Sequence, residues 1–179
     1  MSPDTVLKFE GGHLRPLKSA DVHEGYVAGL NDPDVNQYLE IRHIRQTHQS
    51  VLDFVVANEL SGNSLLWGIW QDESHRHQGT VRLHGIEHVH KTAHIGVCLF
   101  DKATWGKHIG QKAILVVTQW AIDSLQLRWV EAGAYVENIA SQKAFLASGY
   151  AWKFDIPGKY ILEGKPTTVK VFVASGQNQ

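Results

Sequence analysis

The sequence has little of what marks secreted and membrane proteins. Its 179 residues contain one cysteine, Cys98, which leaves no internal disulfide to form and excludes a secreted disulfide scaffold. No segment offers about 18 uninterrupted apolar residues, the length that a membrane-spanning helix needs. The N-terminus also lacks a basic stretch followed by an apolar run. We therefore expect a cytoplasmic protein without export signal or membrane partner.

An excess of charge of one sign is also missing. The chain carries 17 basic and 18 acidic side chains, for a formal net charge of −1. A nucleic-acid partner requires a basic surface, so none is expected. The 43 % of hydrophobic and 20 % of charged residues are typical of a globular protein. The length predicts a single domain over residues 1–179, with a flexible tail at 175–179, and leaves a homodimer open.

Apolar spacing and turn residues predict a mixed order of elements. Strands are expected at residues 5–10, 13–17, 65–70, 80–89, 93–100, 128–135, 150–154 and 168–173. Helices are expected at 20–29, after Pro33, at 47–60, from 113 to 125 and at 138–148. Strands, helices, a strand meander and then strand–helix alternation together predict a mixed α/β (α+β) single domain.

The most informative segment is a strand, a glycine-containing loop and a helix. Residues 95–100 are strand-like, and Trp-Gly-Lys-His-Ile-Gly at 105–110 opens a long apolar helix. Gly106 and Gly110 permit close approach of a ligand to the backbone, where N–H groups at the helix N-terminus can bind a pyrophosphate. A tight structural turn would explain the same glycines.

This loop resembles the acyl-CoA loop of the GNAT superfamily, whose pattern is Gln/Arg-x-x-Gly-x-Gly/Ala. Further similarities are Leu14–Leu17 before a helix, Asn31–Pro33 with Tyr38 and Leu39, and Asn138-x-x-Ser141 leading to Ser148–Tyr150. The details are most similar to the branch that includes ribosomal-protein N-terminal acetyltransferases. Two positions depart from the pattern. Trp105 stands at the Gln/Arg position, and His108 replaces the first motif glycine.

The resemblance implies an enzyme, an acyl-CoA-dependent N-acetyltransferase. Its fold would be a central, mostly antiparallel twisted sheet, splayed at the CoA site and flanked by helices. It would move an acetyl group from acetyl-CoA to a primary amine directly, in a ternary complex. The implied CoA-binding residues are Val97, Cys98 and Leu99 on the splayed strand, Trp105, Gly106, Lys107, His108, Ile109 and Gly110 in the loop, and Asn138 and Ser141.

Two catalytic roles follow from the comparison with the family. His94 stands where the family often has a Glu, and an unperturbed pKa of about 6.5 suits a general base. Many relatives protonate the leaving thiolate with a Tyr, but the matching residue is Phe145. Ser141 is therefore the candidate acid. Alternatively, His94 is an exposed strand residue, and Asn138 and Ser141 only cap a helix.

The acceptor side is implied to include Tyr38, Arg42 and His43, in the connector 38–45. Arg42 and Arg45 beside a Tyr suit a phosphate or carboxylate, and the pattern resembles GNATs that acetylate nucleotide-linked amino sugars. A solvated connector is the alternative. The acceptor stays open between a protein N-terminus and a small-molecule amine, such as a nucleotide-linked amino sugar or a polyamine.

Other readings compete with the acetyltransferase. Six histidines cluster in sequence, at positions 75, 77, 84, 88, 90 and 94, and strand alternation would place His88 and His90 on one face. No HExxH or Cys-rich spacing accompanies them, so no resident metal is predicted. Cys98 has no legible His–Asp partners and is expected in the core rather than as a nucleophile. A non-catalytic CoA-binding or interaction module remains an alternative.

Overall fold

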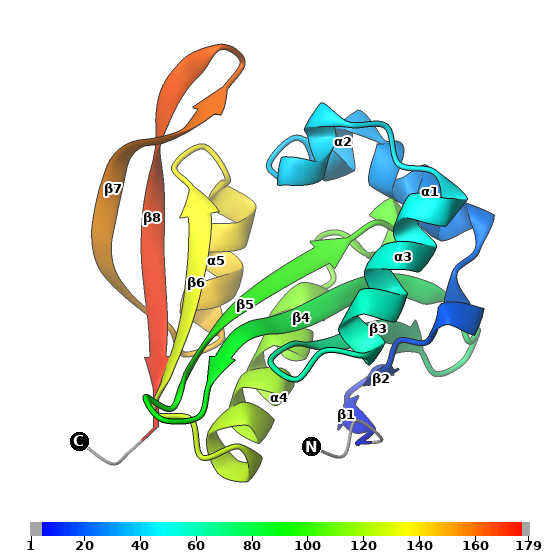
Figure 1. Ribbon diagram of the computed structural model, residues 1–179, viewed down its shortest axis with the longest axis horizontal. Coiled ribbons are helices and arrows are strands. Elements are labelled where there is room, and N and C mark those ends of the chain that lie inside the picture. Colours follow the sequence, from blue (N-terminus) through cyan, green and yellow to red (C-terminus); the bar gives the residue numbers. More distant parts are fainter. Residues whose placement is uncertain (1–4, 177–179) are drawn as a thin grey trace.

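The strands form one eight-stranded sheet with the order β1-β2-β3-β4-β5-β6-β8-β7 (Figure 1). The computed structural model describes residues 5–176. The strands are β1 (Leu7–Phe9), β2 (Gly12–Pro16), β3 (Leu65–Gln71), β4 (His77–Glu87), β5 (Thr92–Leu99), β6 (Trp129–Tyr135), β7 (Ala151–Leu162) and β8 (Lys165–Ser175). Neighbouring strands run antiparallel except β5 and β6, which are parallel. The predicted mixed α/β fold with a mostly antiparallel sheet is confirmed.

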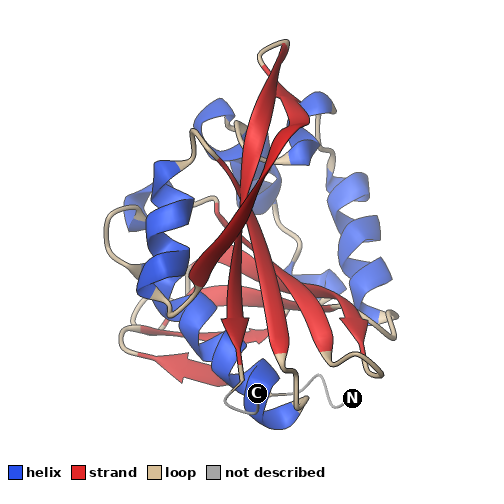
Figure 2. Cartoon of the chain, turned by 90° about the vertical axis from the view of Figure 1, so that its left-hand side faces the viewer, coloured by secondary structure: helices blue, strands red, loops and turns tan. Residues whose placement is uncertain are grey.

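Helices cover both faces of this sheet (Figure 2). They are α1 (Glu24–Asn31), α2 (Pro33–Asn36), α3 (His48–Glu59), α4 (Ile109–Ser124) and α5 (Ile139–Ala147), with 3-10 turns η1 (Ser19–Asp21), η2 (Glu40–His43) and η3 (Lys102–Thr104). On one face α4 buries Ala113, Ile114 and Val117 in the main core. On the other, α1 and α3 build a second core around Tyr26 and Val55. No helix within residues 5–176 is long and apolar enough to cross a membrane.

The parallel pair β5–β6 is short, and its end creates a fork in the sheet. Pairing runs from Thr92↔Trp129 to His94↔Glu131 and stops there, although β5 continues to Leu99 and β6 to Tyr135. Figure 1 shows the two strands diverging beyond this point. Because backbone groups alternate along a strand, every second residue of 95–99 faces the fork without a strand partner. The sheet is splayed where the resemblance implied.

The hairpin of β7 and β8 is much longer than predicted. Strands were expected only at 150–154 and 168–173, but pairing extends to Leu162↔Lys165. The sequence pattern did not predict a strand through Pro157 and Gly158, because proline cannot donate a hydrogen bond to a strand ladder. They are tolerated in a bulge on the edge strand β7. The connecting turn, Glu163–Gly164, has φ values of 49° and 77°, the left-handed geometry of a tight two-residue hairpin.

Three other expectations need correction. The helix expected at 20–29 starts only after His23, whose ring accepts the N–H of Tyr26 and caps α1. The helix after Pro33 is four residues long and gives way to η2. The tail expected from residue 175 is wrong for Ser175, which pairs with Trp129, and for Gly176, which donates to the Arg128 carbonyl. Residues 177–179 lie outside the described part of the chain.

Candidate functional site

The predicted loop joins the end of β5 to the first turn of α4 through two left-handed residues. Gly106 has φ 75° and His108 has φ 61°. His108 is the N-cap of α4 but makes no side-chain capping bond, and its ring lies 3.2 Å from Oε1 of Gln111. The histidine thus adopts the backbone conformation that the motif glycine would supply more easily. The left-handed turn therefore forms even though His108 replaces the first motif glycine.

The N-terminus of α4 presents free backbone donors. Among the described residues, the N–H groups of Ile109, Gly110 and Gln111 have no protein acceptor. Such donors, with the positive end of the helix dipole, form an anion site. Gly110 brings the helix close to β5, since a Cβ there would lie 3.3 Å from Cδ1 of Leu99. Trp105 fastens the loop, because its Nε1 donates to the Leu99 carbonyl at 3.0 Å.

A hollow lies beside this loop, and charged side chains of both signs line it. Its lining includes Lys107 and Ile109 from the loop and Arg76 from the turn before β4. Arg76 forms an ion pair with Asp101 at 2.8 Å. The sequence pattern did not single out Arg76, because nothing local connects a turn residue to a loop 30 positions away. Lys107 is therefore the cation of this hollow that forms no ion pair among the described residues, and it lies next to the free N–H groups of α4.

The strand positions 97–99 divide between the two faces of the sheet. Val97 and Leu99 pack against the main core, whereas Cys98 packs against the second. Cys98 as a residue is partly exposed, but its thiol is buried, and this burial raises the pKa of Cys98 to about 12. A thiol that stays protonated is a poor nucleophile. The geometry agrees with the packing role expected from the sequence and disfavours covalent catalysis.

His94 lies at the fork itself. It pairs with His84 on β4 and with Glu131 on β6, in the last register position before the strands separate. Its side chain is 53 % exposed, and Nδ1 lies 3.6 Å from Oε1 of Glu131. The side chain shares a face with Cys98, four residues along the strand, which is the face covered by α1 and α3. Glu131 was not predicted as a site residue, because only the pairing of β5 with β6 brings it next to His94.

Asn138 and Ser141 meet at the start of α5, next to the end of β6. Oδ1 of Asn138 accepts the N–H of Ser141 at 3.1 Å, the geometry of an N-cap. Within residues 5–176, the Asn138 amide nitrogen and the Ser141 hydroxyl have no hydrogen-bond partner. Phe145 is buried against Tyr150 and Phe172. The capping role is therefore present, and both side chains retain a free polar atom.

The connector residues Tyr38 and Arg42 reach the far end of β6, but Arg42 is already engaged. Its guanidinium donates to the carbonyl oxygens of Leu39 at 3.0 Å and Ile161 at 2.8 Å, and to the Tyr135 hydroxyl at 3.1 Å. The Tyr38 hydroxyl donates to the Glu137 carbonyl at 3.4 Å. These contacts fasten η2 to β6 and the hairpin. They argue against Arg42 as a free anion-binding residue.

His43 and the remaining charges of this acceptor side are more accessible. His43 is 59 % exposed, with Nε2 3.9 Å from Glu40. The Tyr135 hydroxyl donates to the same carboxylate and so joins η2 to β6. Glu137 accepts the Thr167 hydroxyl at 2.7 Å. Glu40, Glu137 and, at the fork, Glu131 make this face rich in carboxylates.

The histidine cluster is dispersed by the fold. β4 ends at Glu87, so His88 and His90 lie in a turn and not on one strand face, as expected. His77 is buried and stacks on Trp70, and desolvation lowers the pKa of His77 to about 3. Residues 5–176 contain no group of three or more His, Cys, Asp or Glu side chains placed to hold a metal.

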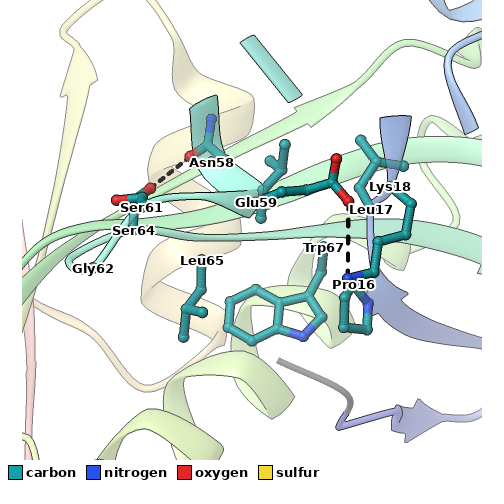
Figure 3. A pocket seen from close by; sticks show the side chains of 11 residues that line it. Pro16, Leu17, Lys18, Asn58, Glu59, Ser61, Gly62, Ser64, Leu65 and Trp67 are labelled. Carbon is teal, nitrogen blue, oxygen red and sulfur yellow. Dashed lines mark hydrogen bonds and ion pairs between the residues drawn. The ribbon is translucent and has the colours of Figure 1, made fainter. Parts of the chain in front are cut away.

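Another hollow lies away from these residues, where β2 and α3 end and β3 begins (Figure 3). There the Ser64 hydroxyl donates to Asn58 at 2.6 Å, and Lys18 lies 3.9 Å from Glu59. None of the predicted catalytic, CoA-binding or acceptor residues lines it. We therefore place the candidate site at the fork and the α4 loop, where the free backbone donors and the predicted residues converge.

Residues 13–151 match the family model described as an acetyltransferase (GNAT) domain. The chain belongs to the GNAT acetyltransferase family. The match spans the fork, the α4 loop and the start of α5, which together contain the predicted donor-side residues. The resemblance read from the sequence is confirmed, as is the enzyme class, an acetyl-CoA-dependent N-acetyltransferase.

Solved GNAT structures share the fold at low identity. A ribosomal-protein α-N-acetyltransferase, RimL, solved with coenzyme A, has a TM-score of 0.86 at 17 % identity and covers 96 % of this chain and 98 % of its own. A spermidine N-acetyltransferase from Vibrio cholerae, solved with CoA and spermine, gives 0.83 at 14 %, with 93 % and 96 % covered. A ribosomal-protein-S5-alanine acetyltransferase from Vibrio fischeri gives 0.81 at 19 %, with 98 % of both chains covered. No curated protein matches the sequence.

Proposed function

We propose that this GNAT protein transfers the acetyl group of acetyl-CoA to a primary amine by direct attack in a ternary complex. The observation that carries the proposal is the alignment of three features along β5. Free N–H groups of α4 lie beyond its end, unpaired backbone groups follow along 95–99, and His94 stands at the fork. At about 3.3 Å per residue, Leu99 and His94 are roughly 16 Å apart, a span that an extended pantetheine arm can cover.

The donor would lie with its pyrophosphate at Ile109–Gln111, near Lys107. Its pantetheine arm would follow the unpaired edge of β5 as a missing strand does. The amide nitrogen of Asn138 would donate to a pantetheine carbonyl, because its oxygen is already used for capping. Each contact uses a group that the fold leaves without a protein partner.

The transfer requires a neutral amine that attacks the thioester carbonyl. As the C–N bond forms, His94 takes a proton from the amine, and a β5 N–H group stabilises the oxyanion. As the C–S bond breaks, the Ser141 hydroxyl donates a proton to the thiolate and regains one from solvent. The protein donates no covalent nucleophile, in keeping with the high pKa of Cys98.

For the acceptor, we infer a cationic amine or a protein N-terminus rather than a nucleotide-linked amino sugar. Arg42 is held by Ile161 and Tyr135, so its guanidinium is not free for a phosphate. Glu40 is paired with Arg42 at 3.3 Å, so Glu137 is the carboxylate left to favour positive charge near the mouth of the site. The similar structures include acetyltransferases of ribosomal proteins and of spermidine, so both acceptor classes occur on this fold. Acetyl-CoA as the acetyl donor is also compatible with the cytoplasmic location expected from the sequence.

The proposal is tested first by calorimetric titration with acetyl-CoA and then by thiol release with amine acceptors. Micromolar binding and acceptor-dependent release of CoA are expected. His94→Ala and Ser141→Ala should each lower kcat by about 10²-fold and leave acetyl-CoA affinity unchanged. Binding without release, for peptide N-termini and polyamines alike, would favour the non-catalytic module. Wild-type rates in both variants would remove the acid and base assignments.

A further inference from the structure

His84, His94 and Glu131 form a row across three adjacent strands. His84 pairs with His94 between β4 and β5, and His94 pairs with Glu131 between β5 and β6. Residues paired across strands project from the same face of the sheet. The two imidazole rings stack at 5.4 Å between centroids, and the carboxylate lies on the opposite side of His94. The row is at the fork, where β5 first offers unpaired backbone.

The backbone around this row makes room for the His94 ring and orients the carboxylate. Gly85 sits in the β4 bulge with φ 58°, and a Cβ there would lie 3.4 Å from Cδ2 of His94. Oε2 of Glu131 lies 3.5 Å from Nε1 of Trp129, while Oε1 lies 3.6 Å from Nδ1 of His94. The carboxylate is therefore flanked by two ring nitrogens, and Nε2 of His94 has no hydrogen-bond partner within residues 5–176.

We propose that Glu131 is a positioning residue that acts through His94. Its carboxylate holds the proton on Nδ1, which leaves Nε2 as the atom that takes a proton from the attacking amine. The same carboxylate then stabilises the imidazolium until His94 releases the proton to solvent. This inference rests on the proposed acetyl transfer. It adds the residue that fixes which ring nitrogen of His94 acts as the base.

The other charged groups around His94 do not replace Glu131. On β4, burial together with Arg82 and His94 lowers the pKa of His84, which keeps that ring neutral. Arg82 is turned away, since its Nε donates to Asn58 at 2.8 Å and to Ser64 at 3.0 Å. On β7, Lys153 lies over the Trp129 ring at 5.9 Å. Glu131 is the carboxylate in contact with His94.

The first test is an NMR measurement of the ring nitrogen shifts of neutral His94, in the wild type and in Glu131→Gln. The proton should lie mainly on Nδ1 in the wild type and move toward Nε2 in Glu131→Gln. Glu87→Gln, an exposed carboxylate at the other end of the β4 bulge, is the matched control and should leave the tautomer of His94 unchanged. The same tautomer distribution in wild type and Glu131→Gln overturns the inference without any assay of activity.

The second test is kinetic and separates this inference from the proposed function. Glu131→Gln should lower kcat about tenfold at constant KM for acetyl-CoA, and Glu131→Asp should restore part of that loss. His94→Ala/Glu131→Gln should be no slower than His94→Ala. If the wild type transfers acetyl groups but the double variant is slower than His94→Ala, Glu131 acts independently of His94. In that case the inference about Glu131 fails and the proposed function stands. If the wild type transfers to no amine, both proposals fail.

Discussion

The guanidinium of Arg42 donates a 2.8 Å hydrogen bond to the carbonyl oxygen of Ile161, 119 positions further along the chain. This contact joins η2 to the β7–β8 hairpin, two segments that lie at the same end of the molecule in Figure 1. The same guanidinium reaches the Tyr135 hydroxyl on β6. One side chain thus ties together the three segments that surround the acceptor side.

Replacing Arg42 should loosen the acceptor side and spare the donor side. We expect Arg42→Ala to lower the free energy of unfolding by about 1–3 kcal/mol, because the acceptors of a charged donor lose their partner. The KM for the amine should rise, while acetyl-CoA affinity stays unchanged. Denaturant unfolding and steady-state kinetics measure both effects. Arg45→Ala, at an exposed neighbouring position, is the control. Equal effects of the two substitutions would contradict a specific fastening role.

Substitution of Gly110 should act on donor binding. In Gly110→Asp, the new Cβ approaches Leu99 and the carboxylate adds negative charge at the start of α4. Loss of a single 1.4 kcal/mol interaction raises Kd about tenfold, and we expect at least this for acetyl-CoA by calorimetry. Gly62→Asp adds the same charge at an open position far from the loop. Unchanged affinity in Gly110→Asp would show that the pyrophosphate lies elsewhere.

Asn138 allows the capping role and the ligand role to be separated. Asn138→Asp keeps the oxygen that accepts the Ser141 N–H but removes the free amide donor. Helix capping by Asp equals that by Asn, so stability should change by less than about 0.5 kcal/mol. Acetyl-CoA affinity should fall. Asn138→Ala should lose both the cap and the affinity. Thermal melts paired with calorimetry distinguish these outcomes, and wild-type affinity in Asn138→Asp would leave Asn138 with capping alone.

His77 should make stability depend on pH below neutrality. Its ring is buried against Trp70 and Phe100, and Nε2 donates to the Gly79 carbonyl at 3.0 Å. Desolvation and then His23 lower the pKa of His77 from 6.5 to about 3, against the raising effects of the Gly79 hydrogen bond and of Asp21, and Arg15 lowers it slightly. The unfolded chain therefore binds the proton more readily. Stability should fall as pH drops from about 6.5 toward 3, by at most about 1.4 kcal/mol per pH unit from this group.

The measurement is urea unfolding at several pH values between 7 and 4, in the wild type and in His77→Gln. Gln retains a donor for the Gly79 carbonyl but does not titrate in this range. The pH dependence should be shallower in the variant, even if the variant is less stable throughout. Parallel pH profiles would show that other groups, such as the paired carboxylates, cause the acid sensitivity.

Local patterns in the sequence predicted most elements and the donor side of the site. The loop at 105–110 lies where expected, because a strand, a glycine turn and an amphipathic helix are all encoded by neighbouring residues. The hairpin was underestimated because Pro157 interrupts its pattern, and only an edge strand tolerates that residue. The prediction that His88 and His90 lie on one strand face was wrong because the alternation of side chains does not show where a strand ends.

The spacing of apolar and glycine residues along the chain was enough to predict the order of the elements and the backbone cradle before α4. The family followed from the resemblance of the motifs at 105–110 and 138–150. The contact of Glu131 with His94 and that of Arg42 with Ile161 could not be predicted from the spacing and appear only in the folded chain. Both contacts depend on which strands become neighbours and in which register. That choice results from burial of the whole sheet between its helices, a property of the assembled core rather than of any local segment.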